Sequence, residues 1–289
     1  MNVLTQVAIP LVVVLMMLVV GMELTAEDFR RVRDRPRAVI IATLAQLLLL
    51  PLLAMALASI FDPLPHIVAG MILVAASPGG AISNYYVYLA GADVALSVTL
   101  TAVSTVLAFA SLPLVTALGF HLLLGERESV AVPVGYMAGQ LLVILLLPTL
   151  AGMWVRHRWP KAVAPRAVML RRLSLFSLAA LVAFVMLDQA DRLAEQLDRL
   201  LLLTLLFTLF AMAAGAVTGR VAGLGGRDRF ALLIEYAARN LGIATVVGVT
   251  LLGHAEFVVF AAAFFIIQVP LMLAAVVLRR RRCSAVARA

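Results

Sequence analysis

Two ionisable residues lie inside otherwise apolar sequence, where they could bind an ion or each other. Glu235 and Arg239 both fall within the hydrophobic stretch 229–252. A charged side chain at the centre of a bilayer costs about 3 kcal/mol on insertion scales, so each of them needs a partner. On a continuous helix the two side chains, four residues apart, would meet on one face. Either they form a self-neutralising ion pair, or Glu235 faces a cavity and helps to coordinate a cation.

Several uncharged polar residues fall at similar depth and favour the second interpretation. They are Gln46, Ser83, Asn84, Ser97 and Thr101. Serine and threonine alone would mean little, because both commonly bond to their own helix backbone. A hard cation, however, is bound by several oxygens from carboxylate, amide, hydroxyl and carbonyl groups. An asparagine beside a helix break, together with a buried glutamate, therefore predicts a cation site around Glu235.

Two interruptions of the apolar sequence stand at corresponding places in the two halves of the chain. The expected break residues are Pro78, Gly79 and Gly80 in the first and Gly242 in the second. Proline removes a backbone donor, and glycine lifts the conformational restraint on the backbone. Asn240 is placed to cap the second broken helix or to contact a substrate. Because non-helical backbone at membrane depth must be buried in protein or line a watery cavity, such paired breaks point to a transporter binding site.

Membrane-spanning helices must hold these residues in place. Of the 289 residues, 64% are hydrophobic and 13% are charged, whereas a soluble domain is typically about half apolar and a quarter charged. With ~20 apolar residues per crossing, the sequence predicts nine spans, at roughly 3–23, 36–60, 65–90, 92–119, 130–155, 172–188, 199–222, 229–252 and 255–278. We expect an all-α polytopic membrane protein in which spans 1–4 and 6–9 are inverted repeats.

The basic residues between the predicted spans indicate the orientation of the chain. Nineteen of the 23 Lys and Arg residues follow spans 1, 5, 7 and 9, and three lie on the opposite side. Cytoplasmic loops hold the excess of Lys and Arg, so the N-terminus is predicted to be outside and the C-terminus in the cytoplasm. Topology therefore explains the net charge of +8, and the sequence does not predict nucleic-acid binding.

Four stretches resemble the bile acid:sodium symporter family. They are Gly-Met-Glu-Leu-Thr-Ala-Glu-Asp-Phe-Arg from Gly21, Ser-Pro-Gly-Gly-Ala-Ile-Ser-Asn from Ser77, Gly-Ala-Asp-Val-Ala-Leu-Ser-Val-Thr-Leu-Thr from Gly91, and Glu-x-x-x-x-Asn from Glu235. The resemblance, to a nine-helix bacterial-type member, implies two broken helices that cross in a core, about 36–119 and 199–278. A smaller panel, about 1–35 and 130–190, would lie beside it, and residues 1–289 would form a single transmembrane transporter domain.

The resemblance also implies which residues bind sodium. One site would use Ser83, Asn84, Ser97, Thr101 and Glu235. A second would use Gln46, Glu235, backbone oxygens near Tyr236 and Ala238, and a glutamine four residues after the glutamate. Arg239 stands in place of that glutamine, and its guanidinium is permanently charged. Arg239 could replace the second cation, could weaken both sites and leave a proton-coupled or uncoupled carrier, or could bind the carboxylate of an organic anion. We favour the first.

The sequence thus predicts a secondary transporter in the plasma membrane, the bacterial inner membrane, that moves a small organic anion by alternating access. Na⁺ would be the coupling ion at the cation site, with no other metal and no cofactor. The alternatives are a sodium-independent or proton-coupled carrier and a cation/proton antiporter. An enzyme is not expected, because no His or Cys lies in the middle of a span to act as nucleophile, base or metal ligand.

Overall fold

The computed structural model describes residues 3–125, 132–188 and 197–286, and all regular elements in these ranges are helical. The long helices are α1 (Val3–Glu23), α3 (Pro36–Phe61), α6 (Val94–Leu123), α10 (Ala167–Asp188), α12 (Leu197–Val221) and α15 (Val259–Val286). The shorter helices are α2 (Ala26–Asp34), α4 (Pro65–Ala76), α5 (Ile82–Leu89), α7 (Val134–Leu141), α8 (Leu147–Arg158), α9 (Pro160–Val163), α13 (Gly226–Ala237) and α14 (Leu241–Val246). π-Helical turns at Leu142–Leu146 and Val247–Leu251 and 3-10 turns at Ala164–Arg166 and Ala255–Val258 complete the set.

Several of these helices can cross a membrane, so the chain is a multi-pass membrane protein. Among the described residues, five stretches are long and apolar enough: Pro36–Phe61, Val94–Leu123, Val134–Arg158, Leu197–Val221 and Ala255–Arg282. A sixth is obtained if α1 and α2, which meet at 60°, count as one bent span. The predicted spans 65–90 and 229–252 are not among them, because each is divided into helices shorter than the ~20 residues of a crossing. The predicted span 172–188, which lies in α10, is not among them either. The number nine and the inverted repeats stay predictions.

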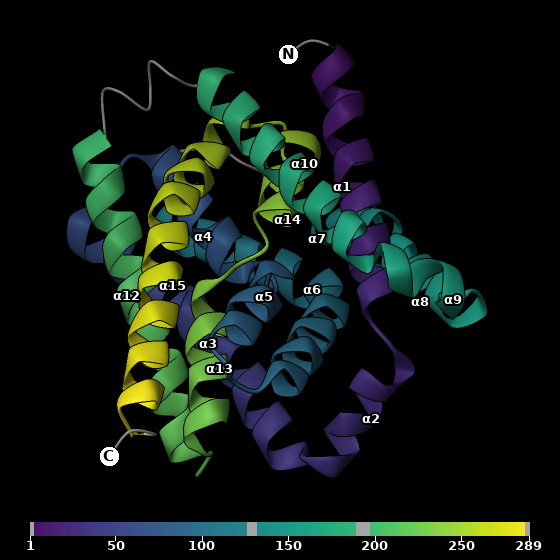
Figure 1. Cartoon of the computed structure of the whole chain (residues 1–289). Coiled ribbons are helices and arrows are strands. Elements are labelled where there is room, and N and C mark those ends of the chain that lie inside the picture. Colours follow the sequence, from purple (N-terminus) through teal and green to yellow (C-terminus); the bar gives the residue numbers. More distant parts are fainter. Residues whose placement is uncertain (1–2, 126–131, 189–196, 287–289) are drawn as a thin grey trace.

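The helices gather into two groups that meet at the centre of the molecule. In Figure 1, α1, α8 and α9 lie on one side and α12 and α15 on the other. α1 packs along α8 so closely that a Cβ on Gly21 would overlap the Thr149 backbone, and one on Gly152 would overlap the Leu18 carbonyl oxygen. Small residues allow this approach of two helices within a membrane. α12 packs against α3, α13 and α15. The predicted division into core and panel remains a prediction.

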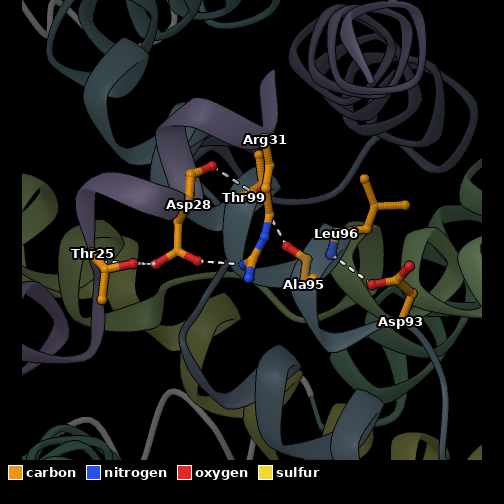
Figure 2. Close-up of polar contacts among 7 residues, drawn as sticks. All are labelled: Thr25, Asp28, Arg31, Asp93, Ala95, Leu96 and Thr99. Carbon is orange, nitrogen blue, oxygen red and sulfur yellow. Dashed lines mark hydrogen bonds and ion pairs between the residues drawn. The ribbon is translucent and has the colours of Figure 1, made fainter. Parts of the chain in front are cut away.

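The short helix α2 is fastened to α6, one of the helices that carry the candidate site (Figure 2). The Asp28 carboxylate accepts hydrogen bonds from the Thr25 N–H and hydroxyl, both at 2.8 Å, and from Arg31 at 2.7 Å. The Thr99 hydroxyl of α6 contacts the Asp28 carbonyl oxygen at 3.0 Å. At the start of α6, Asp93 Oδ1 accepts from the Leu96 N–H at 2.9 Å and caps the helix. The N-terminal end of α6 is thereby fixed.

Two helix breaks cross each other at the centre of the molecule. α4 ends at Ala76 before α5 begins at Ile82, and α13 ends at Ala237 before α14 begins at Leu241. The two unwound segments run antiparallel: the Gly80 N–H donates to the Ala238 oxygen at 2.8 Å, and the Asn240 N–H donates to the Pro78 oxygen at 3.0 Å. Each break thus satisfies backbone groups of the other, which water cannot reach in the interior of a membrane.

Candidate functional site

The Glu235 carboxylate lies at the crossing and is surrounded by hydroxyl groups. Glu235 is in the last turn of α13 and is fully buried. Its Oε2 accepts from Ser83 Oγ at 2.5 Å and from Ser97 Oγ at 3.0 Å, and its Oε1 accepts from Thr101 Oγ1 at 2.7 Å. Ser83 lies in α5, and Ser97 and Thr101 lie in α6. All three are between 134 and 152 residues from Glu235 in the sequence. The fold therefore brings together residues that the sequence places far apart.

The cluster holds more hydrogen-bond acceptors than donors. The Ser97 hydroxyl has one proton, yet it faces both Glu235 Oε2 and Asn84 Oδ1, the latter at 2.8 Å. Ser83 Oγ lies 3.5 Å from Ser97 Oγ and adds a further oxygen. A hydroxyl supplies one donor but two lone pairs, and an ionised carboxylate supplies acceptors alone. The surplus of oxygen lone pairs around a negative charge is chemically suited to a small hard cation.

Glycine at position 79 allows the first break to approach the carboxylate. A Cβ on Gly79 would clash with Glu235 Oε1, so a residue with a side chain does not fit there without displacing the carboxylate. The Gly79 N–H donates to Ser104 Oγ at 3.3 Å, and Ser104 donates in turn to the Thr101 carbonyl oxygen at 3.1 Å. A Cβ on Gly80 would lie 2.9 Å from the Arg239 carbonyl oxygen. The predicted break residues Pro78, Gly79 and Gly80 thus lie at the crossing itself.

Arg239 lies on a different side of the crossing from the hydroxyls. Its side chain is 2% exposed. Nη1 donates to Gln46 Oε1 at 3.4 Å, and Nη2 donates to the carbonyl oxygens of Ala75, at 3.4 Å, and Ser77. Gln46, on α3, is itself fully buried. The fold therefore brings Gln46 and Arg239 together, both of which the sequence analysis had singled out. The carbonyl oxygens of Ala75 and Ser77 could not be predicted, because main-chain groups leave no pattern of side chains in the sequence.

The expected one-face geometry for Glu235 and Arg239 is wrong. Among the described residues, the two side chains form no direct ion pair, although their charges interact electrostatically. α13 ends at Ala237, and Arg239 belongs to the unwound segment, so the four-residue helical spacing does not apply to it. The carboxylate thus turns toward α5 and α6, and the guanidinium turns toward α3 and the end of α4.

Asn240 and Gly242 have structural places in the second broken helix. Asn240 Oδ1 accepts from the Ile243 N–H at 3.2 Å and caps α14, one of the two roles that the sequence left open for it. Gly242 was expected to be part of the break, but it lies inside α14. The unwinding occurs earlier because residues 238–240 pair with residues 78–80.

A cavity of about 150 Å³ lies between α1, α5 and α6 and reaches the hydroxyl cluster. It is lined by Val20, Glu23, Leu24, Ala81, Asn84, Tyr88, Val94, Val98 and Thr101. Asn84 and Thr101 belong both to this lining and to the shell around Glu235. A molecule in the cavity would therefore be adjacent to an ion bound at Glu235.

Comparison with known proteins decides the family. A profile described as the Sodium Bile acid symporter family matches residues 10–196, well over half of the chain. This chain belongs to the sodium bile acid symporter family. The resemblance drawn from the four sequence stretches is therefore confirmed, and membership in a family of transporters supports a role other than that of an enzyme.

Relatives of this symporter-family chain occur in bacteria, plants and animals. An "uncharacterized sodium-dependent transporter", YocS, of Bacillus subtilis (strain 168) is 35% identical over 161 residues, which are 56% of this chain and 48% of that protein. The probable sodium/metabolite cotransporter BASS1, chloroplastic, of Arabidopsis thaliana is 37% identical over 147 residues, 51% and 35% of the two chains. The ileal sodium/bile acid cotransporter of Homo sapiens is 29% identical over 161 residues, 56% and 46%. Each match covers less than half of the relative.

The family match and the structure contribute to different parts of the site. Ser83, Asn84, Ser97 and Thr101 lie within the matched residues 10–196. Glu235 and Arg239 lie beyond them, so their positions beside the matched residues are known from the structure. Sequence reasoning missed Ser104, which supports the first break; its spacing of three from Thr101 on one helix was the available signal.

Proposed function

We propose that this member of the sodium bile acid symporter family is a secondary active transporter that couples inward sodium movement to uptake of a small organic anion by alternating access. The observation that carries the proposal is the acceptor-rich cluster of Ser83, Asn84, Ser97 and Thr101 around the buried Glu235. The names of three relatives, a sodium-dependent transporter and sodium cotransporters of a metabolite or bile acid, support the same assignment.

An ion in the cluster would link elements that belong to both broken helices. Its ligands come from α5, after the first break, from α6, and from α13, before the second break. A cation bound there neutralises Glu235 and holds these three helices in one arrangement. The neighbouring cavity shares Asn84 and Thr101 with the ion site. Sodium binding would therefore set the shape of the cavity that receives the organic anion, which is the coupling that symport needs.

The membrane and its orientation complete the proposal. We place the protein in the plasma membrane, the inner membrane of a bacterium, with the N-terminus outside and the C-terminus in the cytoplasm. The arginine-rich segments 30–37, 156–172 and 279–282 support this orientation through the positive-inside rule. The competing functions, a proton-coupled carrier and a cation/proton antiporter, also use Glu235, but they need no sodium-selective cluster.

The test compares two threonines of α6 that are both buried and one turn apart. Thr101 donates to Glu235, whereas the Thr105 hydroxyl has no hydrogen-bond partner among the described residues. The thermal stability of purified wild type, Thr101→Val and Thr105→Val is measured while NaCl replaces KCl at constant ionic strength. A ligand that binds the folded state alone raises its stability by mass action.

We expect sodium to raise the melting temperature of the wild type and of Thr105→Val equally. In Thr101→Val, the sodium concentration needed for a given rise in melting temperature should be roughly tenfold higher, which corresponds to about 1.4 kcal/mol of binding free energy. Identical sodium responses of the two variants would refute the site. A wild type that responds to pH but not to sodium would refute sodium coupling and favour a proton-coupled carrier.

A further inference from the structure

The Arg239 guanidinium is a buried positive charge, and within the described part of the chain its hydrogen-bond acceptors are all uncharged oxygens. It donates to Gln46 Oε1 and to the carbonyl oxygens of Ala75 and Ser77. An amide oxygen and main-chain carbonyls are also ligands that proteins offer to hard cations. Because the side chain is 2% exposed, water does not replace these contacts. The guanidinium thus occupies a set of oxygens that a mobile cation could otherwise use.

Two of these oxygens come from the end of a helix. α4 ends at Ala76, so the Ala75 and Ser77 carbonyls lie at its C-terminal end. The last carbonyl groups of a helix lack intrahelical partners and carry partial negative charge, which favours a cation nearby. Arg239 supplies that cation from the opposite break. The positive charge is covalently attached to the chain and is present in every state of a transport cycle.

The same guanidinium leaves the hydroxyl cluster untouched. Its described hydrogen bonds go to Gln46, Ala75 and Ser77, whereas the carboxylate of Glu235 is held by Ser83, Ser97 and Thr101. Glu235 and Arg239 together carry no net charge. One mobile cation at the hydroxyl cluster would give the crossing a single positive charge, which would balance one negative charge on a substrate in the adjoining cavity.

We infer that Arg239 is a resident cation of the crossing, and that this chain therefore couples one sodium ion, rather than two, to each organic anion. The inference rests on the proposed function and specifies the ion stoichiometry of the same site. With a monovalent anion, one sodium ion brings no net charge across the membrane, so uptake is electroneutral.

The test counts sodium ions in wild type and Arg239→Gln. Thermal or denaturant unfolding is followed in detergent as NaCl replaces KCl at constant ionic strength. At sodium concentrations well above the dissociation constant, the slope of the logarithm of the unfolding constant against the logarithm of sodium concentration gives minus the number of ions lost on unfolding. We expect about one ion for the wild type and about two for Arg239→Gln, because the vacated oxygens and the new carboxamide can hold a second ion.

Further variants test whether the second sodium ion expected in Arg239→Gln binds at the vacated oxygens. They also keep the test valid if Arg239→Gln is unstable. Adding Gln46→Leu to Arg239→Gln removes one oxygen of the vacated set and should return the count to one. Arg239→Lys keeps the positive charge and should keep the count of the wild type. If Arg239→Gln unfolds in KCl, its recovery in NaCl but not in KCl is the expected result, since sodium then replaces the lost charge.

The outcomes separate this inference from the proposed function. Two sodium ions bound by the wild type, or only one bound by Arg239→Gln, would overturn the assignment of Arg239 as a resident cation. Sodium coupling itself would stand. If the wild type ignores sodium and Arg239→Gln responds to it, the resident cation stands and sodium coupling in the natural chain fails. If neither protein responds to sodium, both fail.

Discussion

Two polar centres lie side by side at the helix crossing, and they differ in the sign of the charge that the chain supplies. The hydroxyl centre consists of Glu235 with Ser83, Asn84, Ser97 and Thr101. The guanidinium centre consists of Arg239 with Gln46 and the carbonyl oxygens of Ala75 and Ser77. The first has a negative charge and surplus acceptors, whereas the second contains its own cation.

The difference indicates how one crossing can combine a mobile and a fixed charge. Both centres lie beside the unwound segments, and every residue in them is buried, with 8% exposure or less. What distinguishes them is whether the positive charge is covalently part of the chain. An ion that can leave gives coupling to a gradient, and a guanidinium that cannot leave supplies a constant positive charge near the buried carboxylate.

The largest effect is expected when the charge of the hydroxyl centre is removed. Glu235→Gln eliminates the negative charge that attracts sodium, and it removes the negative charge nearest to the buried Arg239, which should also destabilise the protein. Sodium-dependent uptake into proteoliposomes should be abolished. The double variant Glu235→Gln/Arg239→Gln restores neutrality, so it should regain stability without regaining uptake. Normal uptake by either variant would contradict the role given to Glu235.

A methyl group at the contact between break and carboxylate should disturb the hydroxyl centre next most strongly. Gly79→Ala places a Cβ against Glu235 Oε1, and overpacking of this kind costs about 1–3 kcal/mol. The control is Gly135→Ala in α7, where an added Cβ meets nothing within 4 Å. Unfolding in NaCl and in KCl should show lost sodium stabilisation for Gly79→Ala and an unchanged sodium response for Gly135→Ala. Equal behaviour of the two would contradict the close approach.

Substitution of two asparagines, Asn84 and Asn240, separates the effect of losing an ion ligand from that of losing a helix cap. Both residues are 8% exposed. Asn84→Ala removes an oxygen of the hydroxyl centre and should weaken sodium binding roughly tenfold, or about 1.4 kcal/mol. Asn240→Ala removes the cap of α14 and should lower stability by about 1 kcal/mol with unchanged sodium affinity. Sodium titrations of thermal stability measure both quantities. The reverse pattern would mean that Asn240, and not Asn84, contacts the ion.

The smallest effect on sodium binding is expected where α6 contacts α2 instead of Glu235. Thr99→Val removes the contact of its hydroxyl with the Asp28 carbonyl oxygen and should cost about 0.5–1.5 kcal/mol of stability. Because Thr99 contacts neither centre, the sodium affinity should stay the same. A sodium affinity lowered as much as in Asn84→Ala would show that α2 takes part in ion binding.

Much of the first break and of the hydroxyl centre could be predicted from residue types. Proline and two glycines at 78–80 forecast an interruption, and the hydroxyls of Ser97 and Thr101 were placed on one face by their spacing. The helical period is a local property, so it survives folding. The same reasoning explains why the family resemblance, carried by these stretches, was correct.

The second break could be predicted as an interruption between residues 235 and 242, with Asn240 as a possible cap, but its unwound residues could not be placed. Nothing in Ala237-Ala238-Arg239 disfavours a helix strongly, and the only glycine nearby, Gly242, is helical. The chain unwinds there because its backbone pairs with the first break, a contact across more than 150 residues. Without that contact, the direction of the Arg239 side chain could not be known, and neither could its partners Ala75 and Ser77, whose contribution is main-chain oxygen.

Equilibrium binding of ²²Na⁺ to the purified wild-type protein tests the distinction between the two centres most directly. The hydroxyl centre should bind a mobile ion and the guanidinium centre should not, so the predicted result is one sodium ion per chain at saturation, lost in the Glu235→Gln variant. Saturation at two ions per chain, or binding that persists in Glu235→Gln, would contradict it.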